Sequence, residues 1–251
     1  MNNRLMTHVV AGYPSTGECI ELLLGMQAVG VEIIEIQIPF SDPGADGPVI
    51  MKANDIALEN GMTVKGCFEM IGEARAQGLS LPVYLMSYAN KIISFGAEAF
   101  CAQTQQYNVN GLIVPDLPYN TADYQSLLAQ SNIHGLDLVP VLSPGVSNHR
   151  LDGYQLDTHE LIYVTSTQGI TGKELVIRQE LRELTAVIKT KTKGQVALGF
   201  GIRTTHDVQQ ALKIADLAVI GSAVIRRVEQ EGVAGALKFL QGCQSVEILV
   251  E

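Results

Sequence analysis

Short runs of apolar residues alternate with longer segments of helical period along the whole chain. The apolar runs are rich in Val, Ile and Leu, and they have the length of parallel strands that are buried on both faces. The predicted strands are Met6–Val10, Ile33–Ile38, Pro82–Met86, Gly111–Val114, Asp137–Leu142, Leu161–Ser166, Gln195–Phe200 and Leu217–Ile220.

The segments between these runs predict helices. Two of them start with clear capping signals, Ser15-Thr16 ahead of Glu18 and Thr204-Thr205 ahead of Asp207. The predicted helices are Thr16–Val29, Thr63–Gln77, Ile92–Tyr107, Thr121–Ser131, Asn148–Gln155, Ile177–Thr190, Thr205–Ile214 and Ala223–Gln230.

A strand followed by a helix, eight times over without a linker, predicts an α/β fold of the (β/α)8 TIM barrel type. Such barrels typically take about 250 residues as one unit, and this chain has 251. We therefore expect a single barrel domain over residues 1–251. An open, doubly wound sheet is the alternative that the pattern leaves.

Composition and charge narrow the class of protein. Apolar residues make up 47% of the chain and charged residues 17%, which fits a large core and argues against disorder. The formal net charge of −9 argues against a nucleic-acid partner, which calls for a basic face. An anionic substrate must therefore be held by local groups against the overall field.

Several features bear on cellular location. The four cysteines are far apart and form no C-x-x-C pair, which argues against a disulfide framework or a zinc site. The first residues lack the apolar segment and cleavage site of a signal peptide, and no stretch approaches the roughly 18 apolar residues of a membrane span. We expect a cytoplasmic protein.

The chemistry of a barrel lies where strands end and the following loops begin. Glu35 and Gln37 are two residues apart on the second strand, so both side chains face the barrel lumen. A carboxylate in an apolar lumen is costly unless it is paired, protonated or functional. Glu35 is thus a candidate acid/base, and its satisfaction by a structural partner is the alternative. Glu32 has the opposite offset, which indicates a solvated or helix-facing position.

Pro39, Pro43, Gly44, Gly47 and Pro48 make the next loop turn-rich and stiff. Asp42 and Asp46 lie in this loop. On the residues alone, an aspartate there is more often a turn-maker that bonds its own backbone than a catalytic group.

Glycine-rich turns follow three consecutive strands in the second half. They contain Gly172, then Gly201, then Gly221 with Ser222. Glycine lets bare backbone N–H groups approach an anion, and a helix that begins at Ser222 would favour negative charge at its N-terminus. Because barrels often bind phosphate after strands seven and eight, these turns predict a phosphate site, although such turns need glycine in any case.

Other chemistry is excluded by residue type. A Schiff-base aldolase needs a lysine in the lumen, and every lysine lies in a predicted helix or loop. A metal-dependent enzyme needs clustered ligands, but His8 is the only histidine on a predicted strand. We therefore expect no metal and no cofactor. Tyr88, Tyr163 and Phe200 near strand ends could hold a flat apolar ligand or simply belong to the core.

With these residues in view, the sequence resembles the tryptophan synthase alpha subunit over essentially its whole length. The segments that carry the resemblance are, in the family's order, I-E-I-Q-I-P-F-S-D-P-G-A-D-G-P, L-M-S-Y-A-N, I-V-P-D-L-P, Q-G-I-T-G, G-F-G-I-R and I-G-S-A. The resemblance implies a barrel lyase of tryptophan biosynthesis that cleaves indole-3-glycerol phosphate to indole and glyceraldehyde 3-phosphate. It also implies a pyridoxal-phosphate-dependent beta subunit as partner, in an alpha2-beta2 heterotetramer.

The resemblance also implies roles for individual residues. Glu35 would be the catalytic acid/base and Asp46 its partner at the indole nitrogen, while Thr171 would bond Asp46 on loop closure. The phosphate would be held by Gly172, Gly201, Gly221 and Ser222, and the indole by Tyr88, Tyr163 and Phe200.

Four departures from the family pattern stand out. Gln37 replaces a usual glycine and is expected to add side chain to the active-site mouth. Gly44 replaces a bulkier apolar residue and is expected to loosen the loop that positions Asp46. His8 stands where an aromatic residue is usual, and the sequence begins almost at the first strand, where the family usually has a helix. Two other functions stay open: a weak alpha-like subunit that mainly activates a beta subunit, and another phosphosugar barrel isomerase.

Overall fold

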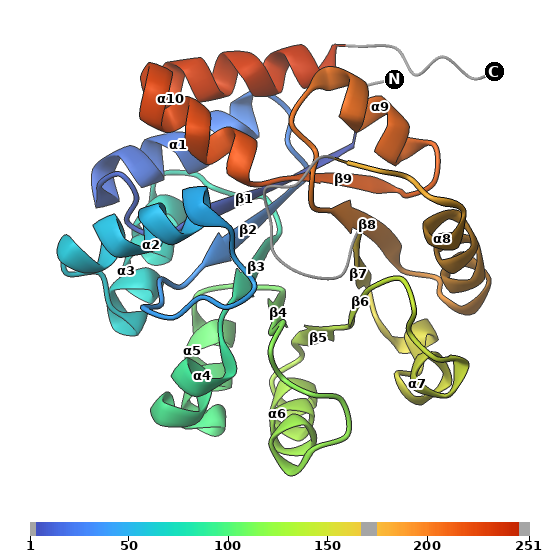
Figure 1. Ribbon diagram of the computed structural model, residues 1–251. Coiled ribbons are helices and arrows are strands. Elements are labelled where there is room, and N and C mark those ends of the chain that lie inside the picture. Colours follow the sequence, from blue (N-terminus) through green and yellow to red (C-terminus); the bar gives the residue numbers. More distant parts are fainter. Residues whose placement is uncertain (1–3, 167–174, 246–251) are drawn as a thin grey trace.

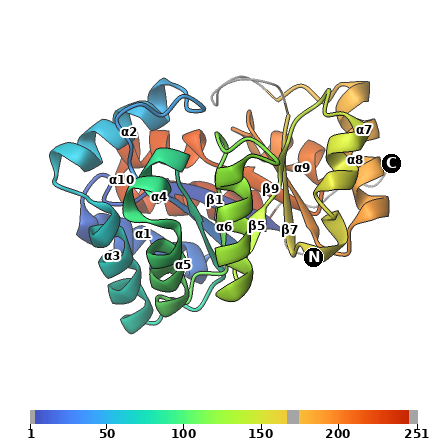
Figure 2. The same ribbon diagram turned by 90° about the horizontal axis from the view of Figure 1, so that it is seen from below.

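In the part of the chain that the structure describes, nine parallel strands form one sheet at the centre, and helices surround it (Figure 1). The computed structural model describes residues 4–166 and 175–245. Figure 2 shows the barrel from the side, with the helices along its outside. The strands are β1 Leu5–Val10, β2 Ile33–Gln37, β3 Val83–Met86, β4 Gly111–Ile113, β5 Asp137–Val139, β6 Val141–Leu142, β7 Leu161–Thr165, β8 Gln195–Gly199 and β9 Leu217–Ile220.

The sheet closes into a barrel through the chain itself. The strand order is β5-β4-β3-β2-β1-β9-β8-β7-β6, so β5 and β6 form its two edges. Only Pro140 separates these two strands. Proline has no N–H to donate to a ladder, but its carbonyl accepts the N–H of Tyr163 at 3.0 Å. The predicted fifth strand, 137–142, is therefore divided at Pro140, and the predicted closed barrel is confirmed.

The α-helices match the predicted ones with three differences. The predicted helix at 92–107 is two helices, because Gly96 has a φ of +91° between them. The last helix is much longer than predicted and turns at Gly232, where φ is +69°. A helix after β2 was not predicted. The helices are α1 Thr16–Ala28, α2 Pro48–Glu59, α3 Val64–Ala76, α4 Ala89–Phe95, α5 Ala97–Gln106, α6 Ala122–Ile133, α7 Asn148–Gly153, the 3-10 helix η1 Leu156–Thr158, α8 Gln179–Lys191, α9 Thr205–Leu212 and α10 Ser222–Gln244.

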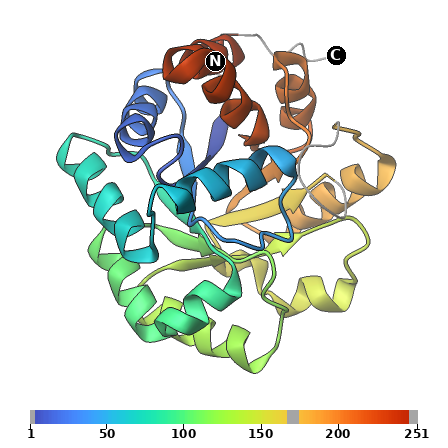
Figure 3. The ribbon, with the colours of Figure 1, turned by 60° about the vertical axis from the view of Figure 1, so that its left-hand side comes forward.

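The unpredicted helix α2 follows directly on the loop that carries Asp46, as the light blue segment of Figure 3 shows. Pro48 begins it, a position where a missing N–H costs nothing. Ile50, Ala53 and Ala57 recur at helical spacing and are buried. The helix packs against α10 and β1, so the loop before it is fixed at both ends.

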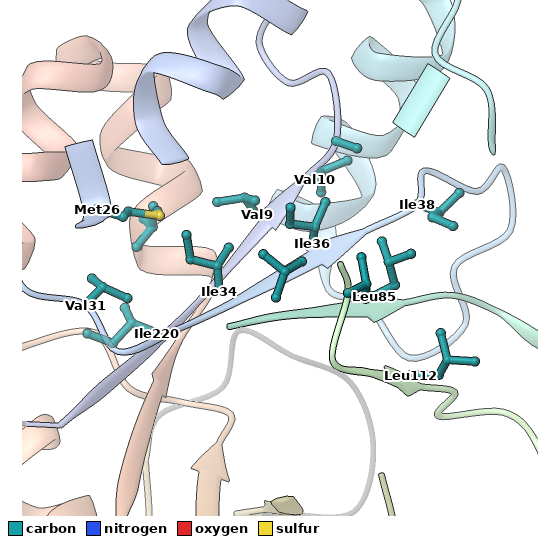
Figure 4. Packing of buried hydrophobic residues seen from close by; sticks show 14 of the residues in the cluster. Val9, Val10, Met26, Val31, Ile34, Ile36, Ile38, Leu85, Leu112 and Ile220 are labelled. Carbon is teal, nitrogen blue, oxygen red and sulfur yellow. The ribbon is translucent and has the colours of Figure 1, made fainter. Parts of the chain in front are cut away.

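Side chains on each strand alternate between the barrel lumen and the layer under the helices. Figure 4 shows the outer layer, in which Val9, Ile34 and Ile36 pack with Met26 of α1. The inner layer includes Met6, Ile33, Tyr84, Met86, Ile113, Leu161, Tyr163, Ala197, Leu217 and Val219. Since Glu35 and Gln37 alternate with Ile34 and Ile36, both side chains face the lumen, as predicted.

Glu32 instead forms a part-exposed ion pair with Arg4, at 2.8 Å between Nη2 and Oε2. None of the helices in the described ranges is long and apolar enough to cross a membrane.

Candidate active site

A cavity opens at the carboxyl ends of the strands. Its apolar wall includes Ile50, Met86, Ile113, Val141 and Val219. Its polar groups come from the lumen and from the loops that follow strands: His8, Glu35, Asp46, Thr165 and Ser222. This is the end of a barrel where chemistry is expected.

Glu35 lines this cavity and is 3% exposed. His8 is its neighbour on β1, where the two residues are in register. His8 Nδ1 lies 3.2 Å from Glu35 Oε1. Glu35 Oε2 and His8 Nε2 have no hydrogen-bond partner among the described residues. The carboxylate is therefore held by one oxygen, and the other can meet a bound molecule.

Asp46 is also buried and lines the same cavity. Two side chains donate to its Oδ2 atom: Gln37 Nε2 at 2.7 Å and Tyr88 Oη at 3.0 Å. The Tyr88 hydroxyl also accepts the N–H of Ala45 at 3.0 Å. Neither side-chain bond uses Oδ1. The aspartate thus accepts hydrogen bonds from two side chains outside its own loop. A turn-making aspartate would instead bond its own backbone.

Burial and charge set the protonation behaviour of this cluster. Burial raises the pKa of Asp46, against the opposing influence of His8 and of the bonds from Gln37 and Tyr88. Burial lowers the pKa of His8, but the nearby carboxylates of Glu35 and Asp46 outweigh it, so that this pKa is raised. Burial also holds the pKa of Tyr163 well above its usual value, and the same two carboxylates add to this effect.

The glycine turns after β8 and β9 meet at this cavity. Gly201, Gly221 and Ser222 all line it. Gly221 is the N-cap of α10, and Ser222 is the first residue of that helix. Helix N-termini carry unpaired N–H groups and favour anions. Gly172 and Thr171, the remaining residues of the predicted phosphate and closure groups, lie outside the described residues.

Two of the three predicted aromatic residues line the cavity. Tyr163 projects from β7, and Phe200 follows β8 with a φ of +73°, an uncommon backbone conformation for this residue type. A Cβ at Gly199 would lie 2.2 Å from Tyr163 Oη, so only glycine leaves room for this ring. Tyr88 is not among the residues that line the cavity; it lies behind Asp46 and stacks on Phe40, with ring centroids 5.2 Å apart.

The structure changes the expectation for Gln37. This side chain was expected to add bulk at the active-site mouth, but it is 0% exposed and does not line the cavity. Its amide points at Asp46 instead. Gly44 lies in open space, with no atom within 4 Å of a Cβ built on it. The loop next to it is nevertheless tied down through Ala45 and Asp46.

Sequence reasoning missed Asn54. This buried residue of α2 accepts hydrogen bonds from Gln37 Nε2 at 3.2 Å and from the N–H of Phe40 at 2.9 Å. It fixes both the loop and the Gln37 amide. The signal was the helical spacing of Ile50, Ala53 and Ala57 after Pro48, which would have placed Asn54 on a buried face.

Taken together, the fold and the site define a (β/α)8 barrel with two buried carboxylates and a helix N-terminus around one cavity. Among residues 4–166 and 175–245, no group of three or more His, Cys, Asp or Glu side chains is placed to hold a metal ion.

Comparison with known proteins identifies the family within this class. The family model described as tryptophan synthase alpha chain matches residues 1–247. The tryptophan synthase alpha chain of Desulforapulum autotrophicum is 37% identical over 237 residues, which cover 94% of this chain and 92% of the relative. The chain belongs to the tryptophan synthase alpha chain family. The predicted family and the predicted carbon–carbon lyase class are thereby confirmed.

Two further similarities are to a longer protein and to a solved structure. Tryptophan synthase of Saccharomyces cerevisiae is 37% identical over 224 residues, which cover 89% of this chain but 31% of that longer protein. The structure of Mycobacterium tuberculosis tryptophan synthase superposes with a TM-score of 0.87 at 28% identity, covering 98% of this chain and 94% of the matched chain.

Proposed function

We propose that Glu35 and Asp46 carry out the reaction of this family member, the cleavage of indole-3-glycerol phosphate to indole and glyceraldehyde 3-phosphate. The observation that supports these roles is that both carboxylates are buried around one cavity and are held differently. Glu35 has one oxygen without a partner among the described residues, and Asp46 is gripped by two donors.

The proposed reaction starts with Glu35 in its acid form. Glu35 gives its proton to C3 of the indole ring, and Asp46 stabilises the positive charge that develops on the ring N–H. Glu35, now a carboxylate, takes the proton of the hydroxyl group on the glycerol carbon that is attached to C3. The electrons of that O–H bond form the aldehyde, the carbon–carbon bond breaks, and its electrons restore the neutral indole. Glu35 returns to its acid form, so no metal ion or Schiff base is required.

The substrate's phosphate would be bound by Gly201, Gly221 and Ser222, together with Gly172. The N–H groups at the start of α10 and the partial positive charge of that helix end support this assignment. Backbone dipoles suit a chain with a net charge of −9, because they bind an anion without a basic surface.

The indole ring would lie between Tyr163 and Phe200, with the apolar wall of the cavity around it. Tyr88 would contribute through Asp46. Thr171 would bond Asp46 when the loop after β7 closes and excludes water. These contacts would place C3 near Glu35 and the ring nitrogen near Asp46.

We also propose a pyridoxal-phosphate-dependent beta subunit as partner, in an alpha2-beta2 assembly. The similar structure from M. tuberculosis is a tryptophan synthase, which supports a partner of this kind. A single domain over residues 1–251 and a cytoplasmic location stay predictions.

The test is indole release from indole-3-glycerol phosphate by the purified chain, alone and with a tryptophan synthase beta subunit. Release without the partner, or only with it, supports the proposed reaction; the second result would mean that the partner completes the active site. If the folded chain releases no indole in either case but accelerates the beta reaction, it is an activating subunit and the proposal is wrong.

A further inference from the structure

We propose that Gln37 is a positioning residue for this reaction: its buried side-chain amide holds Asp46 in the catalytic orientation before substrate binds. This inference rests on the proposed role of Asp46. It replaces the expectation that Gln37 obstructs the active-site mouth.

The bond between the two side chains is short and shielded from water. Gln37 Nε2 lies 2.7 Å from Asp46 Oδ2, Gln37 is 0% exposed and Asp46 is 4% exposed. A hydrogen bond to a carboxylate is stronger than one between neutral groups, and water does not compete for a bond that it cannot reach. Gln37 comes from β2, which pairs with β1 on one side and with β3 on the other. The aspartate on the loop is thereby tied to a rigid element.

The orientation of the Gln37 amide follows from its neighbours. Asn54 Nδ2 donates to the carbonyl of Ile50 at 2.8 Å, and Asn54 Oδ1 accepts the N–H of Phe40 at 2.9 Å. Asn54 therefore presents an oxygen to Gln37. Asp46 presents an oxygen as well, so only the NH2 group of Gln37 fits between them. The alternative orientation would place the amide oxygen against two acceptors.

Gln37 and Tyr88 both hold Asp46 in place. Both donate to the same atom, Oδ2, so this oxygen is held from two directions, and neither bond occupies Oδ1, which is left for the ring N–H of the substrate. A catalytic group that is already oriented avoids an entropic cost in the transition state. Loss of Gln37 would leave the Tyr88 bond as a single pivot, and Asp46 could rotate about it.

A purely structural role for Gln37 makes different predictions from a positioning role. A structural amide would affect the stability of the fold, and its loss would leave turnover by the folded protein unchanged. A positioning amide affects kcat more than KM. It also changes the pH at which Asp46 ionises, because its donor favours the carboxylate form.

The experiment compares Gln37→Met with Gln244→Met. Methionine keeps the length of the side chain and removes the donor. Gln244 is a second buried glutamine, at the end of α10, and its Nε2 donates to the carbonyl of Gly30. Its substitution is the matched control for the loss of a buried amide. Indole release is measured over a range of pH, together with binding of inorganic phosphate as a check on the folded site.

We expect Gln37→Met to lower kcat about 10-fold to 100-fold, in line with the cost of misplacing a catalytic group, with little change in KM. The acid limb of its kcat/KM profile should move to higher pH, because the pKa of Asp46 loses a group that lowers it. The other titratable groups that face Asp46 are His8 from β1, Glu35 from β2, Tyr88 after β3 and Tyr163 from β7. Gln37 also raises the pKa of His8, so its loss lowers the pKa of His8 while it raises the pKa of Asp46, and the two shifts have opposite directions. Gln244→Met should keep the native kcat and pH profile.

Three outcomes overturn the inference: a kcat and pH profile for Gln37→Met that match those of Gln244→Met, an increase in kcat, or a change in KM alone. If Gln37→Met does not fold, Gln37→Gly is measured against the same criteria, since it removes the donor without adding volume. Asp46→Asn separates this inference from the proposed function. Near-native activity of Asp46→Asn defeats the proposed role of Asp46, whereas an inactive Asp46→Asn with a native-like Gln37→Met defeats only the role of Gln37.

Discussion

The substitution Tyr88→Phe removes one hydroxyl group from the active site and leaves the rest of the side chain in place. The phenylalanine ring can keep the stack on Phe40, where the centroids are 5.2 Å apart and the planes differ by 30°. The change removes the bond to Asp46 Oδ2 at 3.0 Å and the acceptor for the N–H of Ala45 at 3.0 Å. It therefore tests how firmly Asp46 must be held.

The expected magnitude follows from these two bonds. A hydrogen bond to a charged group contributes about 1.5–3 kcal/mol. Ala45 is half-buried, so water can replace the lost acceptor of its N–H, and we count little cost for this second bond. We expect the free energy of unfolding to fall by about 2 kcal/mol, which corresponds to a fall of about 4–8 °C in Tm for a domain of this size. If the roughly 1.5–3 kcal/mol of the bond to Asp46 is instead lost in the transition state, kcat/KM falls about 10-fold to 150-fold. The remaining bond from Gln37 places the expectation at the lower end, near 10-fold.

Thermal unfolding and steady-state indole release measure the two effects. Tyr84→Phe is the matched control, because Tyr84 is also buried in the inner core and has no hydrogen bond among the described residues. Equal Tm and equal kcat/KM for the two variants would show that the Tyr88 hydroxyl does not hold Asp46. A fall in Tm with unchanged kcat/KM would show that the bond stabilises the loop but does not orient the carboxylate for reaction.

Two further predictions concern the lumen. Gly199→Ala should lower the free energy of unfolding by about 1–3 kcal/mol through overpacking, because its Cβ would lie 2.2 Å from Tyr163 Oη. The control Gly242→Ala on α10, where a Cβ meets open space, should instead raise the free energy of unfolding by about 0.5–1 kcal/mol. Equal effects of the two substitutions in denaturant unfolding would refute the clash. The raised pKa of His8 means that its contribution to stability is fully present below its ordinary pKa of 6.5 and is lost as pH rises through its raised folded value. The difference in unfolding free energy between the native protein and His8→Asn should therefore shrink above pH 6.5. A difference that stays constant with pH would contradict a raised pKa.

The sequence predicted the parts of this protein that depend on local periodicity. Glu35 and Gln37 face the lumen because strand residues alternate, and this follows from their spacing alone. The strand runs were found because parallel strands are apolar on both faces. Pro140 divides one run because the ladder on either side needs an N–H that proline lacks.

The parts that were missed depend on contacts between distant residues. Gln37 meets Asp46 and Asn54, nine and seventeen positions further along the chain, and no local pattern shows that the loop and α2 fold back onto β2. The cluster of Pro and Gly before Pro48 concealed the start of α2. The division at Gly96 and the turn at Gly232 arise because glycine adopts the positive φ at both positions, and a helical pattern in the sequence does not reveal which glycines do so.

We propose that Glu35 transfers the protons of the reaction, and the substitution Glu35→Gln removes this ability. Glutamine keeps the size of the side chain and can accept the bond from His8, but it cannot give a proton to C3 of the indole ring. Indole release from indole-3-glycerol phosphate should fall by at least about 10² to 10⁴-fold, while binding of inorganic phosphate at the start of α10 is retained. Release within a few-fold of the native rate, by a variant that binds phosphate normally, would contradict the assignment of Glu35 as the acid/base.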